Sequence, residues 1–293
     1  MALSAADARL LRGPVPERAL RWVRTATGGE VERCAPLAGG TSSAVHALDV
    51  AVAGAVRPLV LRRFVRAGWL AEEPDLARRE ALVLERLAPG PVPAPELVAV
   101  DPDGAHAGAP AVLMTRLPGA VVWRPRELEP FLRGLAAALS AIHATPVGPD
   151  ALPAYEPYAL GSRRAPSWSR RPDVWERAFA LLDAPPTGAA PCFIHRDYHP
   201  GNVLWARGAV CGVVDWAVAR IGPPAADIGH CRWNLARALG RDAADRFLAL
   251  CGDDAFHPYW DVAAALGGYD AAELERKDPA EEEFLARAVA ACR

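Results

Sequence analysis

The stretch from His195 to Asn202 reads H-R-D-Y-H-P-G-N and is followed by Val203-Leu204-Trp205. An aspartate and an asparagine therefore share one short polar segment that leads into an apolar run. A carboxylate such as Asp197 can orient a hydroxyl group. The neutral amide oxygen of Asn202 can bind a hard cation without adding another negative charge. Because both side chains lie on one loop, their separation is fixed.

The spacing of this segment is typical of one kind of loop. H-R-D, four residues and then Asn is the pattern of the kinase catalytic loop, in which the Asp accepts the proton of the substrate hydroxyl and the Asn holds Mg²⁺. Asp215 follows in V-V-D-W, at the end of an apolar, strand-like run. A carboxylate there can bridge Mg²⁺ to phosphate oxygens. The joint spacing favours a phosphoryl-transfer site over the alternative, in which Asp197 and Asn202 only cap a turn.

A glycine-rich segment in the first half of the chain could hold phosphates. It lies between two expected strands and contains Gly39, Gly40, Thr41, Ser42 and Ser43. Glycines let the backbone approach a phosphate closely and offer it N–H donors. The same composition occurs in plain hairpin turns, so the residues alone leave both interpretations open.

An ion pair is expected in the same half. Arg62 ends a strand-like run, and Glu80 shares one helix stripe with Leu76 and Leu87. A strand cation paired with a helix carboxylate is the arrangement that holds the α- and β-phosphates in kinases. An inward-facing Glu80 needs a partner. Alternation along the strand does not choose between Arg62 and Arg63 as that partner.

The chain divides into a sheet-rich and a helix-rich region, 1–117 and 118–293. Five strands and a long helix are expected in the first region, namely Val31–Leu37, Ala44–Val52, Pro58–Val65, Glu96–Val100 and Ala111–Leu117, with the helix at Glu72–Leu87. Helices dominate the second region, at Leu128–Ala144, Asp173–Leu182 and from Ala225 onwards. The order predicts an α+β fold of two lobes, with a cleft between them that suits a ligand.

The bulk composition excludes several function classes. The 293 residues are 52% hydrophobic and 23% charged, with a formal net charge of −2, so a broad basic surface for nucleic acid is not expected. No apolar run reaches the roughly 18 residues that a membrane span needs. The six cysteines form no C-x-x-C pair, which argues against a zinc site or a disulfide framework. We expect a cytoplasmic protein with no membrane partner.

At this point the chain resembles the aminoglycoside phosphotransferase and choline kinase-like superfamily, which shares the protein-kinase fold. The resemblance runs from about Val31 to about Arg237. It implies that Asp197 is catalytic and that Asn202 and Asp215 hold Mg²⁺. It also implies a set of supporting residues: His195 and Asp227 brace the catalytic loop, Arg62 rather than Arg63 contacts phosphate, Glu80 positions Arg62, and Met114, Thr115 and Leu117 form the nucleotide-binding hinge between the lobes.

Three features depart from the family's usual pattern. Arg196 stands where family members commonly have glycine, and Arg62 stands where the best-studied kinases have lysine. An arginine still binds phosphate, and does so bidentately. Only eleven residues separate Asp215 from Asp227, which leaves no room for a protein-kinase activation segment. This short spacing counts against a protein substrate.

The sequence thus predicts an enzyme that moves the γ-phosphoryl group of ATP, or of GTP, to a hydroxyl of a small molecule. Aminoglycoside-, macrolide- and choline-like acceptors all fit. The alternative is a catalytically inactive, nucleotide-binding module that serves protein interaction. The identity of the acceptor, the choice of nucleotide and the oligomeric state stay open at this point.

Overall fold

The computed structural model describes residues 5–37, 42–148, 151–157, 160, 163–187, 190–252, 256–267 and 279–292. The chain forms two compact units. The first comprises Met1–Pro118 and Gly212–Val218, and the second comprises Gly119–Cys211 and Ala219–Arg293. The segment Gly212–Val218, which the sequence places in the second region, packs in the first unit. No helix in the described part of the chain is long and apolar enough to cross a membrane.

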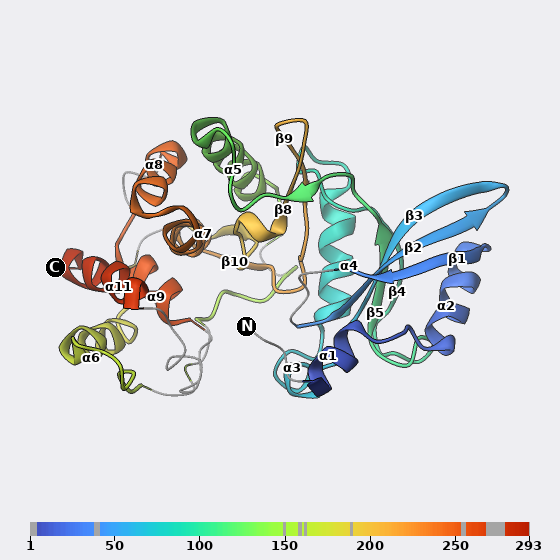
Figure 1. Ribbon diagram of the computed structural model, residues 1–293, viewed down its shortest axis with the longest axis horizontal. Helices are drawn as coiled ribbons and strands as arrows, with labels where there is room; N and C mark the ends of the chain where they lie inside the picture. The colour runs from blue at the N-terminus through green and yellow to red at the C-terminus, as the bar shows by residue number, and fades with distance from the viewer. Residues whose placement is uncertain are drawn as a thin grey trace. The chain divides into compact units, whose positions relative to one another are not determined.

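The first unit is built on a five-stranded sheet (Figure 1). Its strand order is β1-β2-β3-β5-β4, and every pair of neighbours is antiparallel. The strands are β1 (Glu30–Pro36), β2 (Ala44–Val52), β3 (Ala55–Arg63), β4 (Leu97–Asp101) and β5 (Ala111–Thr115). This confirms the expected antiparallel sheet. Strand β3 begins three residues earlier than expected, because Ala53 and Gly54 take positive φ angles of 48° and 83° and close a tight hairpin.

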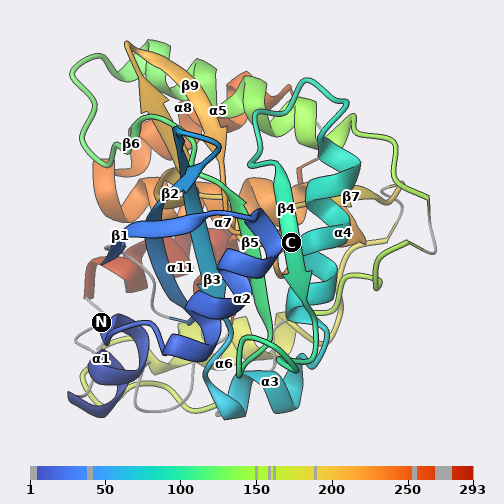
Figure 2. The same cartoon turned by 90° about the vertical axis from the view of Figure 1, so that its right-hand side faces the viewer.

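Helices α2 (Glu17–Thr27) and α4 (Leu76–Leu87) lie on opposite faces of this sheet, and α1 (Ala5–Arg12) and α3 (Ala67–Glu72) lie near one end of it (Figure 1 and Figure 2). Buried residues of α2 pack with Leu48, Leu59, Leu61 and Leu113 on one face. The helix expected at Glu72–Leu87 begins only at Leu76, as α4, and Glu72 instead ends the separate helix α3. Pro74 explains the break, since a proline disfavours helical backbone at the residue before it.

The second unit is mostly helical, as expected. Its helices are α5 (Leu128–His143), α6 (Pro172–Leu181), α7 (Pro224–Leu239), α8 (Arg241–Cys251), α9 (Tyr259–Leu266) and α11 (Pro279–Ala291). Two small sheets accompany them. One contains β6 (Ala120–Val121), β8 (Val203–Ala206) and β9 (Ala209–Val213), and the other pairs β7 (Cys192–Ile194) with β10 (Arg220–Gly222).

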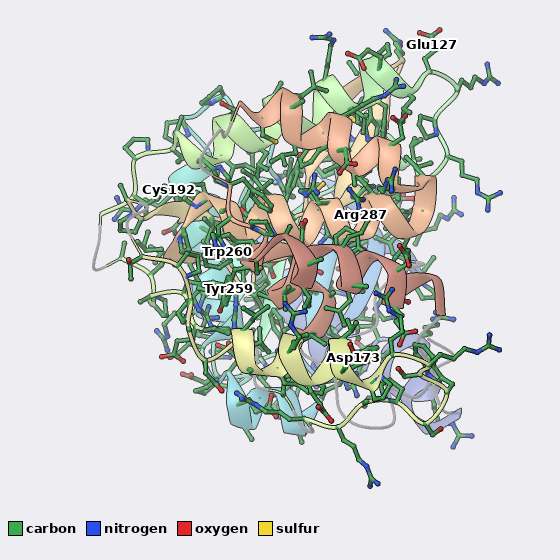
Figure 3. The ribbon with its side chains drawn as sticks, turned by 90° about the vertical axis from the view of Figure 1, so that its left-hand side faces the viewer. Glu127, Asp173, Cys192, Tyr259, Trp260 and Arg287 are labelled. Carbon is green, nitrogen blue, oxygen red and sulfur yellow. The ribbon has the colours of Figure 1, made fainter. Side chains whose placement is uncertain are left out.

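A buried cluster joins α6, α7, α9 and α11, and it includes Trp175, Trp233, Leu266 and Leu285. Figure 3 shows Asp173 at the start of α6, Arg287 on α11, and Tyr259 and Trp260 at the start of α9. Both of these aromatic side chains are buried. They therefore belong largely to the packed interior of the second unit.

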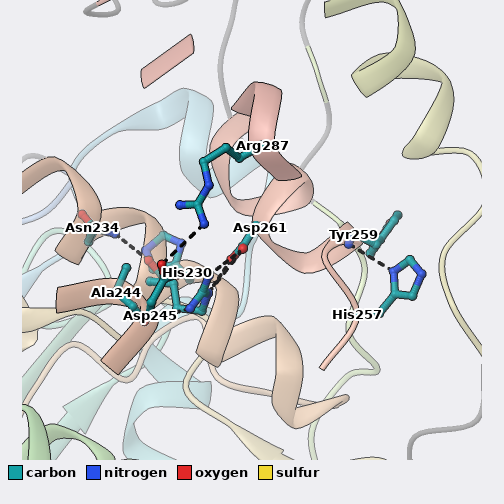
Figure 4. A network of polar contacts seen from close by, with 9 residues as sticks. His230, Asn234, Ala244, Asp245, His257, Tyr259, Asp261 and Arg287 are labelled. Carbon is teal, nitrogen blue, oxygen red and sulfur yellow. Dashed lines mark hydrogen bonds and ion pairs between the residues drawn. The ribbon is translucent and has the colours of Figure 1, made fainter. Parts of the chain in front are cut away.

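One arginine ties three helices of the second unit together. Arg232 of α7 donates from Nε and Nη2 to the carboxylate of Asp261 in α9, at 2.9 and 3.0 Å, and from Nη1 to the Ala244 carbonyl of α8 at 2.8 Å. Arg287 of α11 reaches Asp245 of α8 at 3.4 Å (Figure 4). The planar guanidinium of Arg232 binds Asp261 and the Ala244 carbonyl at the same time. It therefore fixes the position of α7 and of the site residues on this helix.

Candidate active site

The loop from His195 to Asn202 follows β7 and ends in a short 3-10 helix, Pro200–Asn202. Asp227, in the first turn of α7, is fully buried and accepts hydrogen bonds from the backbone N–H groups of His195 and Arg196, at 2.8 and 2.7 Å. The Nε2 atom of His143 lies 3.0 Å from the same carboxylate. One buried carboxylate therefore braces the start of the loop, in the position that the sequence suggested for Asp227.

Two further contacts anchor this loop. The Tyr198 hydroxyl donates to the Leu135 carbonyl of α5 at 2.7 Å, and the Nδ1 of His195 accepts from the backbone N–H of Asp197 at 3.3 Å. Arg196 takes a left-handed φ of 69°, a conformation that costs a non-glycine residue about 1–2 kcal/mol. Strain of this kind persists only where surrounding contacts fix the backbone, and here Asp227 supplies them.

Asp197 is the focus of the loop, and its side chain is 33% exposed. Asn202 donates from Nδ2 to the Asp197 carbonyl at 2.9 Å and to its Oδ2 at 3.2 Å. On the other carboxylate oxygen, Oδ1, the Nε2 of His230 lies at 3.0 Å and that of His199 at 3.7 Å. Since the amide nitrogen of Asn202 faces Asp197, its amide oxygen is the atom that can bind a cation.

The charge of Asp197 is stabilised by these neighbours. Burial by itself raises the pKa of Asp197, but the hydrogen bond from His230 and the nearby imidazoles of His199 and His195 outweigh burial. The net result is a pKa of Asp197 below its usual range. The carboxylate is therefore ionised near neutral pH, which suits a group that accepts a hydrogen bond from an incoming hydroxyl.

The first unit holds a second constellation, centred on Arg62. Its Nη1 lies 2.7 Å from Oε1 of Glu80 on α4, which confirms the expected pairing of Arg62, rather than Arg63, with Glu80. Its Nη2 lies 2.6 Å from Oδ1 of Asp215, and its Nε donates to the hydroxyl of Ser43 at 2.8 Å. The strand register explains the choice, because Arg62 faces α4 while Arg63 lies on the α2 face with His46 and Leu61.

Burial and charge compete in this constellation. Arg62 and Glu80 are 4% and 1% exposed. Burial lowers the pKa of Arg62, but the carboxylates of Asp215 and Glu80 outweigh burial and raise it above its ordinary value. Burial raises the pKa of Glu80, an effect that Arg62 opposes and Asp215 reinforces. Arg62 is thus a permanently charged group held between two carboxylates.

The segment that carries Asp215 is fixed by backbone contacts within the first unit. Val213 donates from its N–H to the Pro93 carbonyl at 2.7 Å, and Arg79 of α4 donates to the Ala217 carbonyl at 3.1 Å. The buried indole of Trp216 donates to the Val213 carbonyl at 2.9 Å. Asp215 takes a left-handed φ of 71°, a conformation that aspartate tolerates better than most residues. This tight turn directs the carboxylate of Asp215 to Arg62.

The remaining expected binding residues are placed as follows. Gly39, Gly40 and Thr41 lie outside the described residues. Ser42 lies in a bend before β2, while Ser43 is buried against Arg62. Met114 is buried in β5, the Oγ1 of Thr115 accepts from the N–H of Glu96 at 2.8 Å, and Leu117 follows β5 half-buried. The nucleotide contacts expected of these residues stay predictions.

The donor chemistry of two residues fits Mg²⁺. Asp215 offers a carboxylate oxygen in the first unit, and Asn202 offers an amide oxygen in the second. Mg²⁺ prefers hard oxygen ligands of this kind and usually binds proteins through one or two such groups. The residues present are therefore suited to this ion.

The sequence interpretation missed two histidines at this site, because it gave no role to His199 or to His230. The signal that could have found His230 is its position three residues after Asp227, on one helix. Side chains at this spacing share a helix face, so a residue there reaches the loop that Asp227 braces. His199 could have been found as a second imidazole within the segment from His195 to Asn202.

A protein-family model agrees with this geometry. The model described as "Phosphotransferase enzyme family" matches residues 33–288, which is most of the chain. The chain belongs to the phosphotransferase enzyme family. The match contains Arg62, Glu80, the whole loop around Asp197, Asp215 and Asp227. The constellations of both units therefore lie within the part of this phosphotransferase that the family model matches.

A curated relative of this phosphotransferase is a homoserine kinase from Gluconacetobacter diazotrophicus. It is 32% identical over 179 residues, which are 53% of this chain and 52% of that protein. The chain thus matches about half the length of that kinase.

Solved structures share the fold over nearly the whole chain. A putative aminoglycoside phosphotransferase from Ralstonia eutropha has a TM-score of 0.63 and 16% identity, over 94% of this chain and 98% of that one. A thermostable mutant of the aminoglycoside phosphotransferase APH(4)-Ia, in ternary complex with ADP and hygromycin B, has a TM-score of 0.58 and 16% identity, over 93% and 96% of the two chains. At these identities the likeness shows the kinase-like α+β fold.

Proposed function

We propose that this chain is an ATP-dependent small-molecule kinase, which transfers the γ-phosphoryl group of ATP to a hydroxyl of its acceptor and releases ADP. The observation that carries the proposal is the loop braced by Asp227. On this loop Asp197 is ionised and bonded to Asn202. Phosphoryl transfer passes through a loose transition state, so positioning and charge neutralisation are most of what the protein must supply.

Each residue has one role in this proposal. Asp197 accepts a hydrogen bond from the acceptor hydroxyl and so directs a lone pair of the hydroxyl oxygen at phosphorus. It takes the proton of the hydroxyl as the phosphate ester forms. Arg62 neutralises phosphate oxygens, and Glu80 holds Arg62 in place. Asn202 and Asp215 each offer an oxygen ligand to Mg²⁺, which neutralises phosphate charge when it is bound. His195 and Asp227 keep the loop in its strained conformation.

The nucleotide and the acceptor rest on similarity. The solved relative with ADP supports ATP as the donor, with GTP as the other candidate. The acceptor is a hydroxylated small molecule. A homoserine-like acceptor is supported by the curated relative, and an aminoglycoside by the solved structures. Macrolide- and choline-like acceptors remain in the same class of hydroxylated amines. We expect a cytoplasmic enzyme that acts on no nucleic acid or membrane.

The test is ATP turnover with and without Mg²⁺ over a panel of homoserine, choline, aminoglycosides, macrolides and amino sugars. Asp197→Ala is the matched variant. General-base groups typically contribute about 10²- to 10⁴-fold to the rate, so the variant is expected to lose turnover on this scale while it still binds ATP. If the parent chain binds ATP but phosphorylates nothing, or if Asp197→Ala keeps the parental turnover, the inactive nucleotide-binding module becomes the better description.

A further inference from the structure

Both oxygens of the Asp197 carboxylate have a nitrogen neighbour within the second unit. Oδ2 accepts from Asn202 at 3.2 Å, and Oδ1 has His230 Nε2 at 3.0 Å and His199 Nε2 at 3.7 Å. Asn202 belongs to the same loop as Asp197, whereas His230 comes from α7. The imidazole of His230 thus gives the carboxylate a contact with a different element of the unit.

The cluster of Asp197, His199 and His230 is compact enough to hold a metal ion. Hydrogen bonding argues against this interpretation. Nδ1 of His199 accepts the backbone N–H of Gly201 at 3.0 Å, so a neutral His199 carries its proton on Nε2, which faces Asp197. A metal ion on Nε2 would need the lone pair that this proton occupies. His230 faces an ionised carboxylate, which only accepts hydrogen bonds, so Nε2 of His230 also carries a proton.

His230 is held in a defined place. It lies one helical turn after Asp227, which is fixed by hydrogen bonds to the catalytic loop. Its ring centroid lies 5.7 Å from that of His199 and 6.0 Å from that of Trp233. Arg232, two residues further along α7, forms ion pairs with Asp261 and Asp245. The helix that presents the imidazole is therefore held by polar contacts on both sides of His230.

We propose that His230 is a positioning residue, which donates its Nε2–H to Oδ1 of Asp197 and sets the plane of this carboxylate toward the acceptor hydroxyl. The inference rests on the proposed phosphotransfer and adds a residue to it. The carboxylate of an aspartate rotates readily about its last side-chain bond. Donors on both oxygens, His230 on Oδ1 and Asn202 on Oδ2, stop this rotation. Misplacing a reacting group by 1 Å can cost about 100-fold in rate.

The kinetic test compares His230→Leu, which removes the donor, with His230→Gln, whose amide N–H can replace it. His230→Leu is expected to lower kcat by about 10- to 100-fold with an unchanged KM for ATP. His230→Gln is expected to recover most of this loss. His106→Leu, at an exposed histidine of the first unit, is the matched control. Equal kcat values for all three variants, or a change in KM for ATP alone, would overturn the inference.

A spectroscopic test keeps the inference separate from the proposed function. Two-bond ¹H–¹⁵N spectra of the imidazoles are expected to show Nε2-protonated His199 and His230, and the His230 signals are expected to shift in Asp197→Ala. A parent chain without turnover on any acceptor would overturn the proposed function, and these spectra would still decide whether the hydrogen bond exists. An Nδ1-protonated His230 would overturn the inference. So would tight Zn²⁺ binding that is lost in His230→Leu, because it would show a metal site.

Discussion

Arg62 Nη2 lies 2.6 Å from Asp215 Oδ1, so the carboxylate proposed to bind Mg²⁺ is paired with the guanidinium proposed to bind phosphate. The other end of this guanidinium is paired with Glu80 at 2.7 Å. If Asp215 binds Mg²⁺ through Oδ1, we expect Arg62 to leave Asp215 and to pair with phosphate oxygens, while Glu80 continues to hold its Nη1. The ion pair would then couple Mg²⁺ binding to phosphate binding.

This coupling predicts a magnesium-dependent effect of Asp215→Ala. Loss of a charged ligand should weaken Mg-ATP binding by about tenfold or more, which corresponds to about 1.4 kcal/mol. Asn202→Ala should weaken it less, because an amide offers only a dipole to the cation. Without Mg²⁺, Asp215→Ala should bind ATP at least as tightly as the parent, since Arg62 is released. Calorimetry with and without Mg²⁺ measures all of these affinities, and equal Mg-ATP affinities for the three proteins would remove both residues from the metal site.

The Arg62–Glu80 pair predicts a large effect on stability. Removing one partner of a buried ion pair typically costs about 3–5 kcal/mol, because a charge is left uncompensated. Asp215 still pairs with Arg62, so Glu80→Ala should lower the free energy of unfolding by about 3 kcal/mol, the lower end of this range. Glu85→Ala, at an exposed position on the same helix, should change it by less than about 0.5 kcal/mol. Urea unfolding compares the two variants, and similar losses for both would contradict a special role for Glu80.

The sequence predicted the parts that depend on local pattern. The spacing of Asp197, Asn202 and Asp215 is a property of the chain itself, so it predicts the loop and the following strand without any long-range contact. The inward stripe around Glu80 follows from helical periodicity, which also gave the approximate helix. The start of this helix after Pro74, rather than before it, could have been predicted from the proline itself. These features are encoded within a few neighbouring residues.

Other features depend on contacts between distant segments. Gly212–Val218 packs in the first unit because Val213 bonds to Pro93 and Ala217 to Arg79, pairings that no sequence pattern records. Ser43, whose expected phosphate contact stays a prediction, accepts a hydrogen bond from Arg62, a contact that the sequence did not indicate. His230 is distant from Asp197 in the sequence and meets it only because Asp227 attaches α7 to the catalytic loop. Tertiary hydrogen bonds decide all three.

His46 predicts a pH-dependent stability of the first unit. Its side chain is buried in β2, and Nε2 lies 2.9 Å from the Gly13 carbonyl. Burial, aided by the charge of Arg63, lowers the pKa of His46 below its ordinary value of 6.5, although the Gly13 contact opposes the shift. The unfolded chain therefore binds a proton that the folded chain resists. Stability should be full above pH 6.5 and should decline as the pH falls below it.

The matched variant is His46→Gln, which can keep a hydrogen bond to Gly13 but does not titrate. Thermal melts from pH 8 to pH 5 are expected to show a smaller fall of Tm for this variant than for the parent. His106→Gln, at an exposed histidine, should leave the parental fall unchanged. Parallel curves of Tm against pH for the parent and His46→Gln would show that His46 does not govern the loss of stability at acid pH.

The backbone conformation of Arg196 predicts which substitutions the loop tolerates at this position, next to Asp197. Its φ of 69° lies in the left-handed region, which is open to glycine and strongly disfavoured for β-branched residues. Its guanidinium donates to the Glu156 carbonyl at 2.9 Å, and its backbone N–H donates to Asp227. Arg196→Gly removes a backbone cost of about 1–2 kcal/mol and loses a hydrogen bond of similar worth. Its unfolding free energy should stay within about 1 kcal/mol of the parent, with turnover retained.

Arg196→Val loses the same hydrogen bond and cannot relax φ, so it should lower the unfolding free energy by about 2 kcal/mol or more and lower kcat by tilting Asp197. Urea unfolding and turnover of the two variants test this difference, and a valine variant as stable and as active as the glycine variant would show that the strained backbone at Arg196 does not position Asp197.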